Sequence, residues 1–361
     1  MHKTTWVEFN SKALRHNANT VRRCAPHAAI LAMVKANGYG HGAEWVAEQL
    51  HDIVDGFAVA RPSEAFRLRK ARPNDRILLL GTELNSVLLN DCAAHQLDIV
   101  IHDIDTARLL ANTPLSKAVT VWLKMNTGMN RLGMSATDFA DAHRLLSAQR
   151  HITAIHHMSH FSDAETEDTS ITQAQYQALT SLSSTLGEVP LSMANSAAII
   201  AHPTTHLDWV RPGIMLYGDD PTCTLAPEDQ PLQAVMSFKA KVLAVRDVEP
   251  GEGVGYNRRW KAAHKARIAT IAAGYADGYP RQAVDGTPVL INDQRATLAG
   301  RVSMDLLTVD VSHLADIKAG DIATLWGDAL SAAEVGRHCN TISYELFTRI
   351  TQRVERFYLP S

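Results

Sequence analysis

The sequence AILAMVKANGYGHG, residues 29–42, helps to decide between a doubly wound sheet and a (β/α)8 barrel, the two folds in which parallel strands alternate with helices. Residues 29–34 form an apolar run that predicts a short buried strand, and Lys35 follows it directly. A doubly wound dinucleotide-binding fold needs a G-x-G-x-x-G turn after its first strand, and the glycines here have a different spacing. A lysine where a strand leaves the core costs desolvation energy unless it has a partner or is chemically altered.

Similar apolar runs recur before residue 215, with amphipathic segments between most of them. The eight predicted strands are 29–34, 56–59, 77–80, 99–101, 119–123, 152–157, 191–193 and 207–210. Helical spacing is present at 11–23, behind Asn10 or Ser11 as a cap, and at about 172–186. Eight strands that alternate with helices predict a (β/α)8, or TIM, barrel.

The pattern changes after about residue 228, where strand-like segments are separated by Gly, Pro and Asp turns. The predicted strands are 236–248, 267–275, 287–293, 295–300 and 306–313, and helical patterns follow near 331–338 and 343–350. The segment 219–233 is rich in Pro, Asp and Thr, which is typical of a linker. We therefore expect an α/β + β chain, with a TIM barrel over residues 1–227 and a mainly β domain over residues 228–361.

Composition narrows the function classes. The 361 residues are 46% hydrophobic and 20% charged, as in an ordinary soluble globular protein, and the net charge of −3 gives no reason to expect nucleic acid or an anionic membrane as a partner. The four cysteines form no CxxC pair, and there is no apolar run of about 18 residues. The first ten residues lack the apolar stretch of a signal peptide, so we expect a cytoplasmic enzyme.

Polar residues follow at least five of the predicted barrel strands, at the ends where TIM-barrel enzymes place their active sites. They are Lys35, Lys124, His160, Asn195, Ser196 and Arg211. This fold often binds phosphate after its seventh and eighth strands, where Ser196 opens a helix-like segment and Gly213 permits close backbone approach. A phosphate site together with Lys35 suggests pyridoxal 5′-phosphate (PLP), which bonds to a lysine through a Schiff base.

The histidines of HITAIHHMSH, residues 151–160, raise the alternative of a metal site. Their spacing matches no zinc signature, and no carboxylate completes a ligand set. We expect no metal and interpret His156 and His157 as core residues.

Six motifs, in collinear order from Lys35 to Asp305, resemble those of the alanine racemase family. They are VKANGYGHG (34–42), NTGMNRLGM (126–134), ANSAA (194–198), VRPGIMLYG (210–218), GYADGYPR (274–281) and GRVSMD (300–305). The first and fifth are specific enough that coincidence is a poor explanation. The resemblance implies interconversion of L-alanine and D-alanine by a two-base PLP mechanism, with Lys35 and Tyr275 on opposite faces of the reacting carbanion.

The resemblance also implies roles for other residues of the motifs. Those implied to hold PLP are Lys35, Tyr39, His160, Asn195, Ser196, Arg211, Gly213, Ile214 and Tyr344, with the Tyr39 hydroxyl on the phosphate. Those implied to contact substrate are Arg131, Met304 and Asp305, where Arg131 would contact either the carboxylate side of the substrate or the phenolic oxygen of the cofactor. Lys124 matches a position that is often a carbamate in the family and could then orient Arg131, whereas Asn126 stands where aspartate is common.

Arg211 would face the pyridine nitrogen of the cofactor. An arginine cannot accept a proton there, because its pKa lies above about 12. The ring nitrogen would then stay neutral and withdraw electrons less strongly, which suits a reaction that only removes and returns a proton.

Tyr275 and Met304 lie in the second domain, and the family places the matching residues in the partner's site. We therefore expect a homodimer with shared active sites. Alternatives are a PLP-dependent racemase for serine or for many amino acids, or, with less support, a barrel-type PLP decarboxylase or D-amino-acid aldolase. A non-enzymatic PLP carrier would be a lone barrel, so residues 228–361 argue against it.

Overall fold

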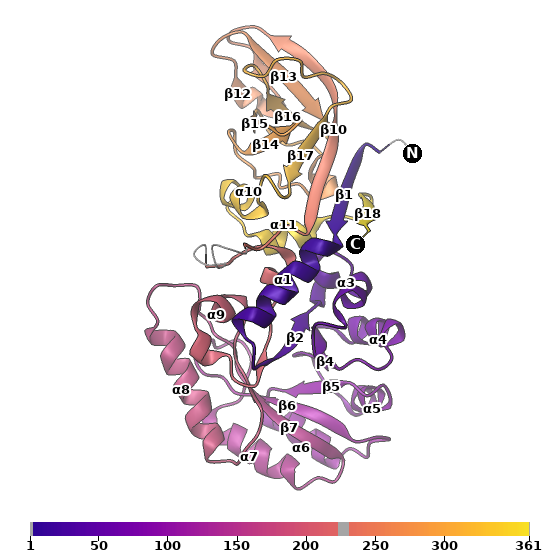
Figure 1. Cartoon of the computed structure of the whole chain (residues 1–361), viewed down its shortest axis with the longest axis vertical. Coiled ribbons are helices and arrows are strands. Elements are labelled where there is room, and N and C mark those ends of the chain that lie inside the picture. The colour runs from indigo at the N-terminus through magenta and orange to yellow at the C-terminus, as the bar shows by residue number, and fades with distance from the viewer. Residues whose placement is uncertain (1–2, 223–230, 361) are drawn as a thin grey trace.

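The computed structural model describes residues 3–222 and 231–360, in an elongated molecule with a barrel at one end and a β-sheet domain at the other (Figure 1). The middle of the predicted linker, residues 223–230, lies outside the described residues. No helix within the described ranges is long and apolar enough to cross a membrane.

A closed barrel of eight parallel strands confirms the TIM-barrel prediction. Its strands are β2 (Ala29–Met33), β3 (Gly56–Val59), β4 (Ile77–Leu79), β5 (Asp98–Ile101), β6 (Val119–Lys124), β7 (Ile152–Met158), β8 (Leu191–Ser192) and β9 (Trp209–Val210). The first and last strands pair directly, Ala29 with Trp209 and Ile30 with Val210, and this pairing closes the barrel. All strand ends that carry predicted site residues therefore meet at one rim.

Helices surround the barrel (Figure 1). They are α1 (Ser11–Cys24), α3 (Ala43–Leu50), α4 (Pro62–Ala71), α5 (Ser86–Ala94), α6 (Ile104–Asn112), α7 (Ala136–Ser147), α8 (Ser170–Ser184) and α9 (Ser196–Ala201). The side chain of Asn10 accepts a hydrogen bond from the Ala13 amide at 3.1 Å, so it is the cap of α1.

The second sheet has eight strands in the order β13-β16-β15-β14-β17-β10-β1-β18. Their bounds are β1 (Thr5–Asn10), β10 (Met236–Val248), β13 (Ala266–Ile271), β14 (Pro288–Ile291), β15 (Gln294–Leu298), β16 (Leu307–Asp310), β17 (Ile322–Trp326) and β18 (Glu355–Leu359). The helices α10 (Ala332–His338) and α11 (Ser343–Arg349) lie between this sheet and the barrel (Figure 1). The predicted strand 236–248 matches β10, and both predicted helices are present.

The strand β1 was not predicted, and it belongs to the second sheet although it precedes the barrel in sequence. It is antiparallel to β10, where Val7 faces Phe238, and parallel to β18, where Val7 faces Arg356. The chain therefore enters the barrel from the second sheet and returns to that sheet after the barrel is complete. The strands β17 and β18 were also not predicted.

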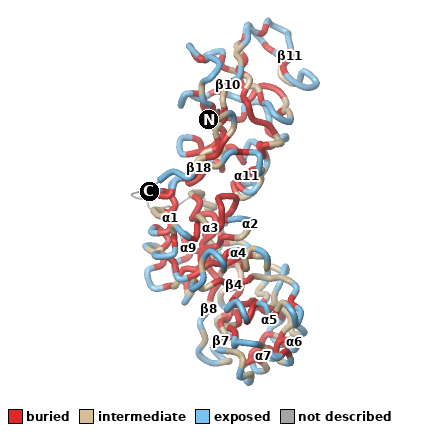
Figure 2. Tube along the Cα trace, turned by 90° about the vertical axis from the view of Figure 1, so that its right-hand side faces the viewer, coloured by how far each residue is buried: buried red, intermediate tan, exposed pale blue. Residues whose placement is uncertain are grey.

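The two parts of the molecule share one hydrophobic core. Buried residues run from the barrel through α11 into the second sheet (Figure 2). Phe9 of β1, Met236 of β10 and Phe347 of α11 belong to the same cluster as the barrel strands. Packing of this kind holds the second sheet in place relative to the barrel rim.

Candidate active site

A cavity of about 420 Å³ lies at the C-terminal ends of the barrel strands. The predicted site residues that line it are Lys35, Tyr39, Lys124, Arg131, His160, Asn195, Ser196, Arg211, Gly213, Ile214 and Tyr344. The lining also includes apolar and glycine positions that were not predicted from the sequence, which are Met33, Ala60, Leu80, Gly81, Val100, Leu132 and Met158. Apart from Leu132, which belongs to the NTGMNRLGM motif, these residues lie at or near strand ends, and that placement was the available signal.

Lys35 begins α2 (Lys35–Tyr39), which is a left-handed turn rather than an ordinary helix. The φ angles are +52° at Ala36, +56° at Asn37, +62° at Gly38 and +51° at Tyr39. Left-handed backbone costs a non-glycine residue about 1–2 kcal/mol, so the surrounding structure has to impose it. Strain of this kind concentrates at functional sites. Here the left-handed turn sets the direction in which the chain leaves the strand after Lys35.

The two lysines of the cavity are shifted toward the neutral amine. Burial lowers the pKa of Lys35, and Arg131 and Arg211 lower it further, while Glu64 opposes them. Burial and the cations Arg211, Arg131 and Lys35 lower the pKa of Lys124 to about 8. A neutral amine is the form that bonds to a carbonyl carbon or accepts a proton.

Arg211 is buried and held by four acceptors. Its Nη1 donates to the Ser192 hydroxyl at 2.5 Å, and its Nη2 donates to the carbonyl oxygens of Ser159 (2.6 Å) and Met193 (3.2 Å) and lies 3.3 Å from Nδ1 of His160. Burial lowers the pKa of Arg211 to about 10, so it remains a cation at neutral pH. Its Nε has no partner among the described residues. The contact places His160 beside Arg211 in the cavity, and the bond of Arg211 to Ser192 was not predicted.

The rim after β8 and β9 provides hydroxyl and amide donors. The Ser196 hydroxyl oxygen accepts hydrogen bonds from the amides of Gly213 (2.9 Å) and Met215 (3.3 Å), which leaves its own proton available to the cavity. Ile214 is the first residue of the 3₁₀ helix η2 (Ile214–Tyr217), where the amide has no partner within the helix. The Asn195 side chain caps α9 by accepting from the Ala198 amide.

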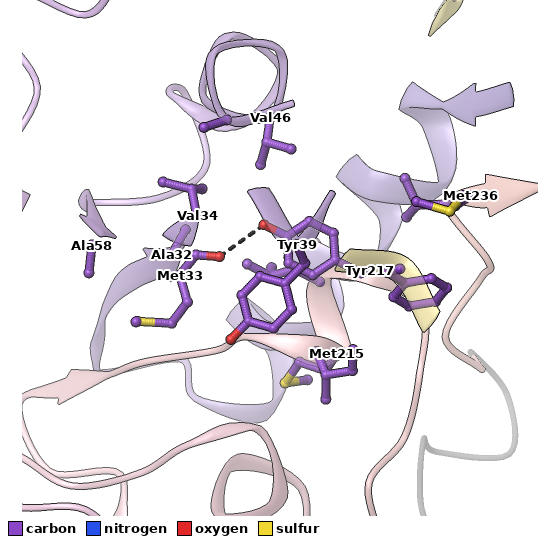
Figure 3. Packing of buried hydrophobic residues seen from close by; sticks show 14 of the residues in the cluster. Ala32, Met33, Val34, Tyr39, Val46, Ala58, Met215, Tyr217 and Met236 are labelled. Atoms are coloured by element: carbon purple, nitrogen blue, oxygen red, sulfur yellow. Dashed lines mark hydrogen bonds between the residues drawn. The ribbon is translucent and has the colours of Figure 1, made fainter. Parts of the chain in front are cut away.

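Tyr39 reaches this same rim. A Cβ atom at Gly213 would lie 2.6 Å from the Tyr39 hydroxyl oxygen, so only glycine permits the approach. The ring of Tyr39 stacks on Tyr217 with a centroid distance of 4.7 Å, and the Tyr217 hydroxyl donates to the Met33 carbonyl (Figure 3). Tyr344 of α11 approaches Tyr39 from the second domain, at 5.9 Å between ring centroids.

The loop after β6 is shaped by Asn126. Its side-chain oxygen accepts hydrogen bonds from the amides of Gly128 (3.1 Å) and Asn130 (3.0 Å), which an aspartate carboxylate could also do. An amide brings no negative charge, and none of the described residues that line the cavity is acidic. With asparagine in place of the aspartate that is common at this position, the cations of the cavity have no acidic neighbour among its described lining residues.

The remaining predicted site residues, Tyr275, Met304 and Asp305, do not line this cavity. They form a separate cluster on the second domain. The Tyr275 amide donates to the Ser303 carbonyl at 3.1 Å, and Arg353 pairs with both Asp277 (2.9 Å) and Asp305 (2.8 Å). Met304 is 53% exposed and Tyr275 is half-buried. The cluster thus presents its predicted functional groups at the surface of the chain.

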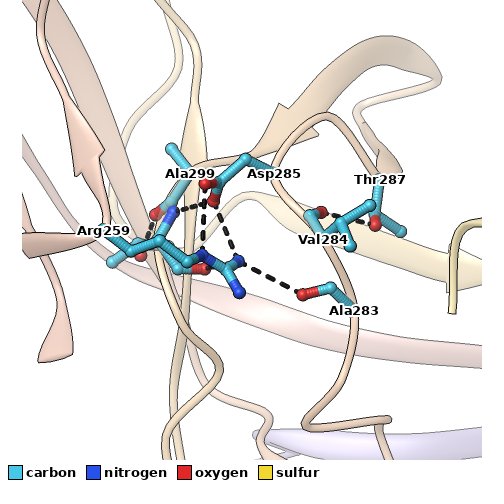
Figure 4. Close-up of polar contacts among 8 residues, drawn as sticks. Arg259, Ala283, Val284, Asp285, Thr287 and Ala299 are labelled. Carbon is cyan, nitrogen blue, oxygen red and sulfur yellow. Dashed lines mark hydrogen bonds and ion pairs between the residues drawn. The ribbon is translucent and has the colours of Figure 1, made fainter. Parts of the chain in front are cut away.

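An ion pair supports the start of the loop that carries Met304. Arg259 pairs with Asp285 at 2.9 Å and donates to the carbonyls of Ala283 and Gly300, and Asp285 accepts from the Gly300 amide (Figure 4). Gly300 is the first residue of the GRVSMD motif. Both peptide groups of Gly300 are therefore held by charged side chains.

The histidines of β7 belong to the barrel wall, as interpreted from the sequence. His156 stacks on Trp122 at 4.4 Å, and His157 lies 2.9 Å from both the His143 ring and the Ser183 hydroxyl. Only His160 of this segment lines the cavity. Within residues 3–222 and 231–360, no group of three His, Cys, Asp or Glu residues is arranged to hold a metal ion.

Comparisons with known proteins agree over nearly the whole chain. The family model described as "Alanine racemase, N-terminal domain" matches residues 9–221, and "Alanine racemase, C-terminal domain" matches residues 235–358. An alanine racemase of Chromohalobacter salexigens is 42% identical over 360 residues, which are 99% of this chain and 98% of that protein.

Solved structures agree as well. The crystal structure of biosynthetic alanine racemase from Pseudomonas aeruginosa matches with a TM-score of 0.96 at 41% identity, over 99% of this chain and all of that chain (100%). Alanine racemase from Acinetobacter baumannii matches with a TM-score of 0.90 at 31% identity, over 99% and 100% of the two chains.

Proposed function

Because this chain belongs to the alanine racemase family, whose activity is the interconversion of L-alanine and D-alanine, we propose that PLP is its cofactor and that Lys35 and Tyr275 are its two catalytic bases. The observation that supports this most is the division of the predicted residues into two groups. The residues expected to hold the cofactor line one cavity, and the second base lies with two substrate residues in an exposed cluster. A second copy of the chain would supply that cluster, so we propose a homodimer in which each site is shared.

The donor set of the cavity fits PLP. Lys35 offers an amine with a lowered pKa, and the Nε of Arg211 is the one nitrogen of that guanidinium that has no partner among the described residues. The hydroxyls of Tyr39 and Ser196 and the amide of Ile214 offer donors for a phosphate. When bound, PLP supplies an electron-withdrawing ring that acidifies the α-carbon proton of an amino acid.

The chain's own residues would then move that proton. The Nζ of Lys35 would remove or return it on one face, and the Tyr275 hydroxyl would do so on the other. Arg211 stays protonated, and its four acceptors fix its position, so it cannot take up the proton. Asn195, Gly213, His160 and Tyr344 would shape the cofactor site.

Contacts with the amino acid would come from both groups of residues. Arg131 would bind its carboxylate side, and Met304 and Asp305 would line its pocket from the partner. We further propose that Lys124 carries a carbamate, which would supply the negative charge that Asn126 does not and would orient Arg131.

We propose that residues 1–227 and 228–361 act as two domains, with β1 added to the sheet of the second. We also propose that the enzyme works in the cytoplasm and supplies D-alanine for peptidoglycan. The support for that role is the likeness to a Pseudomonas aeruginosa protein described as "Alanine racemase, biosynthetic", which is 42% identical over 351 residues.

The experiment is hydrogen exchange at the α-carbon in deuterated water with the Tyr275→Phe variant. Racemisation should fall equally in both directions, because a catalyst cannot change an equilibrium constant of one. Exchange needs only one face, so D-alanine should still exchange through Lys35 while L-alanine becomes nearly inert. PLP affinity should be unchanged. Equal exchange of both enantiomers would remove Tyr275 from its role.

A further inference from the structure

Three consecutive carbonyl oxygens, those of residues 39–41, each accept a hydrogen bond from a side chain. The His41 Nδ1 lies 2.9 Å from the Tyr39 oxygen, the Arg356 Nη1 donates to the Gly40 oxygen at 2.5 Å, and the Tyr358 hydroxyl donates to the His41 oxygen at 3.2 Å. The first of these residues, Tyr39, is the last residue of the left-handed turn that starts at Lys35, and the other two follow it. Their peptide groups are therefore held in one orientation at the point where the turn ends.

His41 is fully buried, although nothing in the reaction requires it. Its ring packs against Tyr217, Phe347 and Phe9, at centroid distances of 4.6, 5.2 and 5.3 Å. Its Nε2 has no hydrogen-bond partner in the part of the chain that the structure describes. An unpaired buried nitrogen lowers stability, and a phenylalanine would fill the same space without that loss.

The histidine therefore supplies something that an apolar ring lacks, which is the hydrogen bond from Nδ1. The acceptor is a carbonyl, so Nδ1 carries the proton. Burial lowers the pKa of His41 to about 3, and the positive charge of Arg356 also acts to lower it, so the ring stays neutral.

We propose that His41 is a positioning residue for Tyr39. It acts through the Tyr39 carbonyl and through Tyr217, whose ring stacks on Tyr39 (Figure 3). Together these contacts fix the place of the Tyr39 hydroxyl beside Gly213. The inference rests on the proposed function, in which this hydroxyl binds the cofactor phosphate.

Two variants separate the hydrogen bond from the ring. His41→Phe keeps the ring and removes the Nδ1 donor, whereas His41→Asn keeps an amide donor near that position and removes the ring. The measurement is the dissociation constant of the apo-protein for PLP and for pyridoxal, which lacks the phosphate. We expect His41→Phe to bind PLP about tenfold more weakly, with pyridoxal unchanged, and His41→Asn to recover most of the loss.

A double-mutant cycle with Tyr39→Phe tests whether His41 affects PLP binding through Tyr39. Tyr39→Phe alone should weaken PLP but not pyridoxal, and adding His41→Phe should then cause little further loss. If Tyr39→Phe leaves PLP binding unchanged, the proposed function of Tyr39 is wrong. If Tyr39→Phe weakens PLP while His41→Phe does not, or if the two losses multiply, His41 does not act through Tyr39.

Thermal unfolding of each apo-protein shows whether the variant folds. Should His41→Phe not fold, His41→Asn and His41→Leu form a second matched pair, because they are similar in shape and only the asparagine can donate. Weaker PLP binding by His41→Leu than by His41→Asn supports the proposal, and equal affinities overturn it.

Discussion

Lys35, Lys124, Arg131 and Arg211 place four cationic side chains around one cavity, with no acidic residue among its described lining. Each charge makes its neighbours harder to protonate, and this effect contributes to the lowered pKa values of both lysines. An anionic cofactor relieves part of this repulsion. A carbamate on Lys124 would relieve more of it, because it replaces a cation with an anion.

Lys124 is therefore expected to react with carbon dioxide. Only the neutral amine reacts, so the carbamylated fraction should rise as the pH passes upward through about 8. The measurement is a carbamate carbonyl signal in ¹³C NMR after equilibration with labelled bicarbonate, with Lys124→Arg as the control. We expect Lys124→Ala to lose about 10- to 100-fold in activity, as for other residues that orient a site side chain. Absence of the label at pH 9 would contradict the carbamate.

At the scale of elements, the helices and strands that were predicted best are those whose hydrophobic pattern lies within their own residues. The segment 236–248 alternates over its own length and became β10, and all eight barrel strands have their own apolar runs. The strand β1 was missed because both of its partners, β10 and β18, are more than 200 residues away in sequence. The left-handed turn at Lys35 was missed because Ala36 and Tyr39 have no local preference for positive φ. Distant side chains such as Arg67 and Arg356 help to hold that segment.

Arg353 joins two elements of the second domain that carry predicted site residues. It pairs with Asp277 in η4 (Tyr275–Asp277) and with Asp305 in the GRVSMD loop. Arg353→Ala leaves the buried Asp277 carboxylate without its cation, so Tyr275 should lose its position. We expect kcat to fall about tenfold with PLP affinity unchanged, because Arg353 does not line the cavity.

The matched control for that change is Arg349→Ala. Among the residues that the structure describes, Arg349 forms an ion pair only with Glu345 of the same helix, at 3.2 Å, and a pair of this kind contributes about 0.3–0.5 kcal/mol. Its kcat should be close to that of the parent protein. If Arg353→Ala and Arg349→Ala have the same kcat, the ion pairs of Arg353 do not position Tyr275 for catalysis.

At the scale of the whole molecule, we predict that two copies of the chain share each active site. Lys35→Ala and Tyr275→Phe proteins are each expected to be inactive. When they are mixed after dissociation and reassociation, the hybrid dimer should contain one site with both residues intact. Recovery of up to half the activity per hybrid is expected, whereas confirmed exchange of subunits without recovery would mean that sites are not shared.

Buried neutral histidines should make the fold sensitive to acid. Burial lowers the pKa of His156 to about 4 and those of His41 and His157 to about 3, against about 6.5 in an unfolded chain. Below pH 6.5 the unfolded chain binds more protons, so stability falls as the pH drops toward 4. Each histidine contributes up to about 1.4 kcal/mol per pH unit.

Urea midpoints between pH 7 and 5 measure this loss. His156→Asn should reduce the slope, whereas His27→Asn, at an exposed position, should leave it unchanged. Buried carboxyl groups with raised pKa values, such as Asp98, act in the opposite direction, so the comparison between the two variants is the deciding measurement.

The position of β1 has a consequence for synthesis on the ribosome. This strand is made first, but β10 begins at Met236 and β18 at Glu355, so β1 has no partner strand while the entire barrel is being translated. At about 5–20 residues per second, that wait lasts on the order of ten to fifty seconds. The hydrogen bonds of Arg356 and Tyr358 to residues 40 and 41 form later still. We therefore expect the barrel to leave the ribosome before the turn that starts at Lys35 is held in its final conformation. A nascent chain stalled before residue 355 should therefore retain PLP poorly.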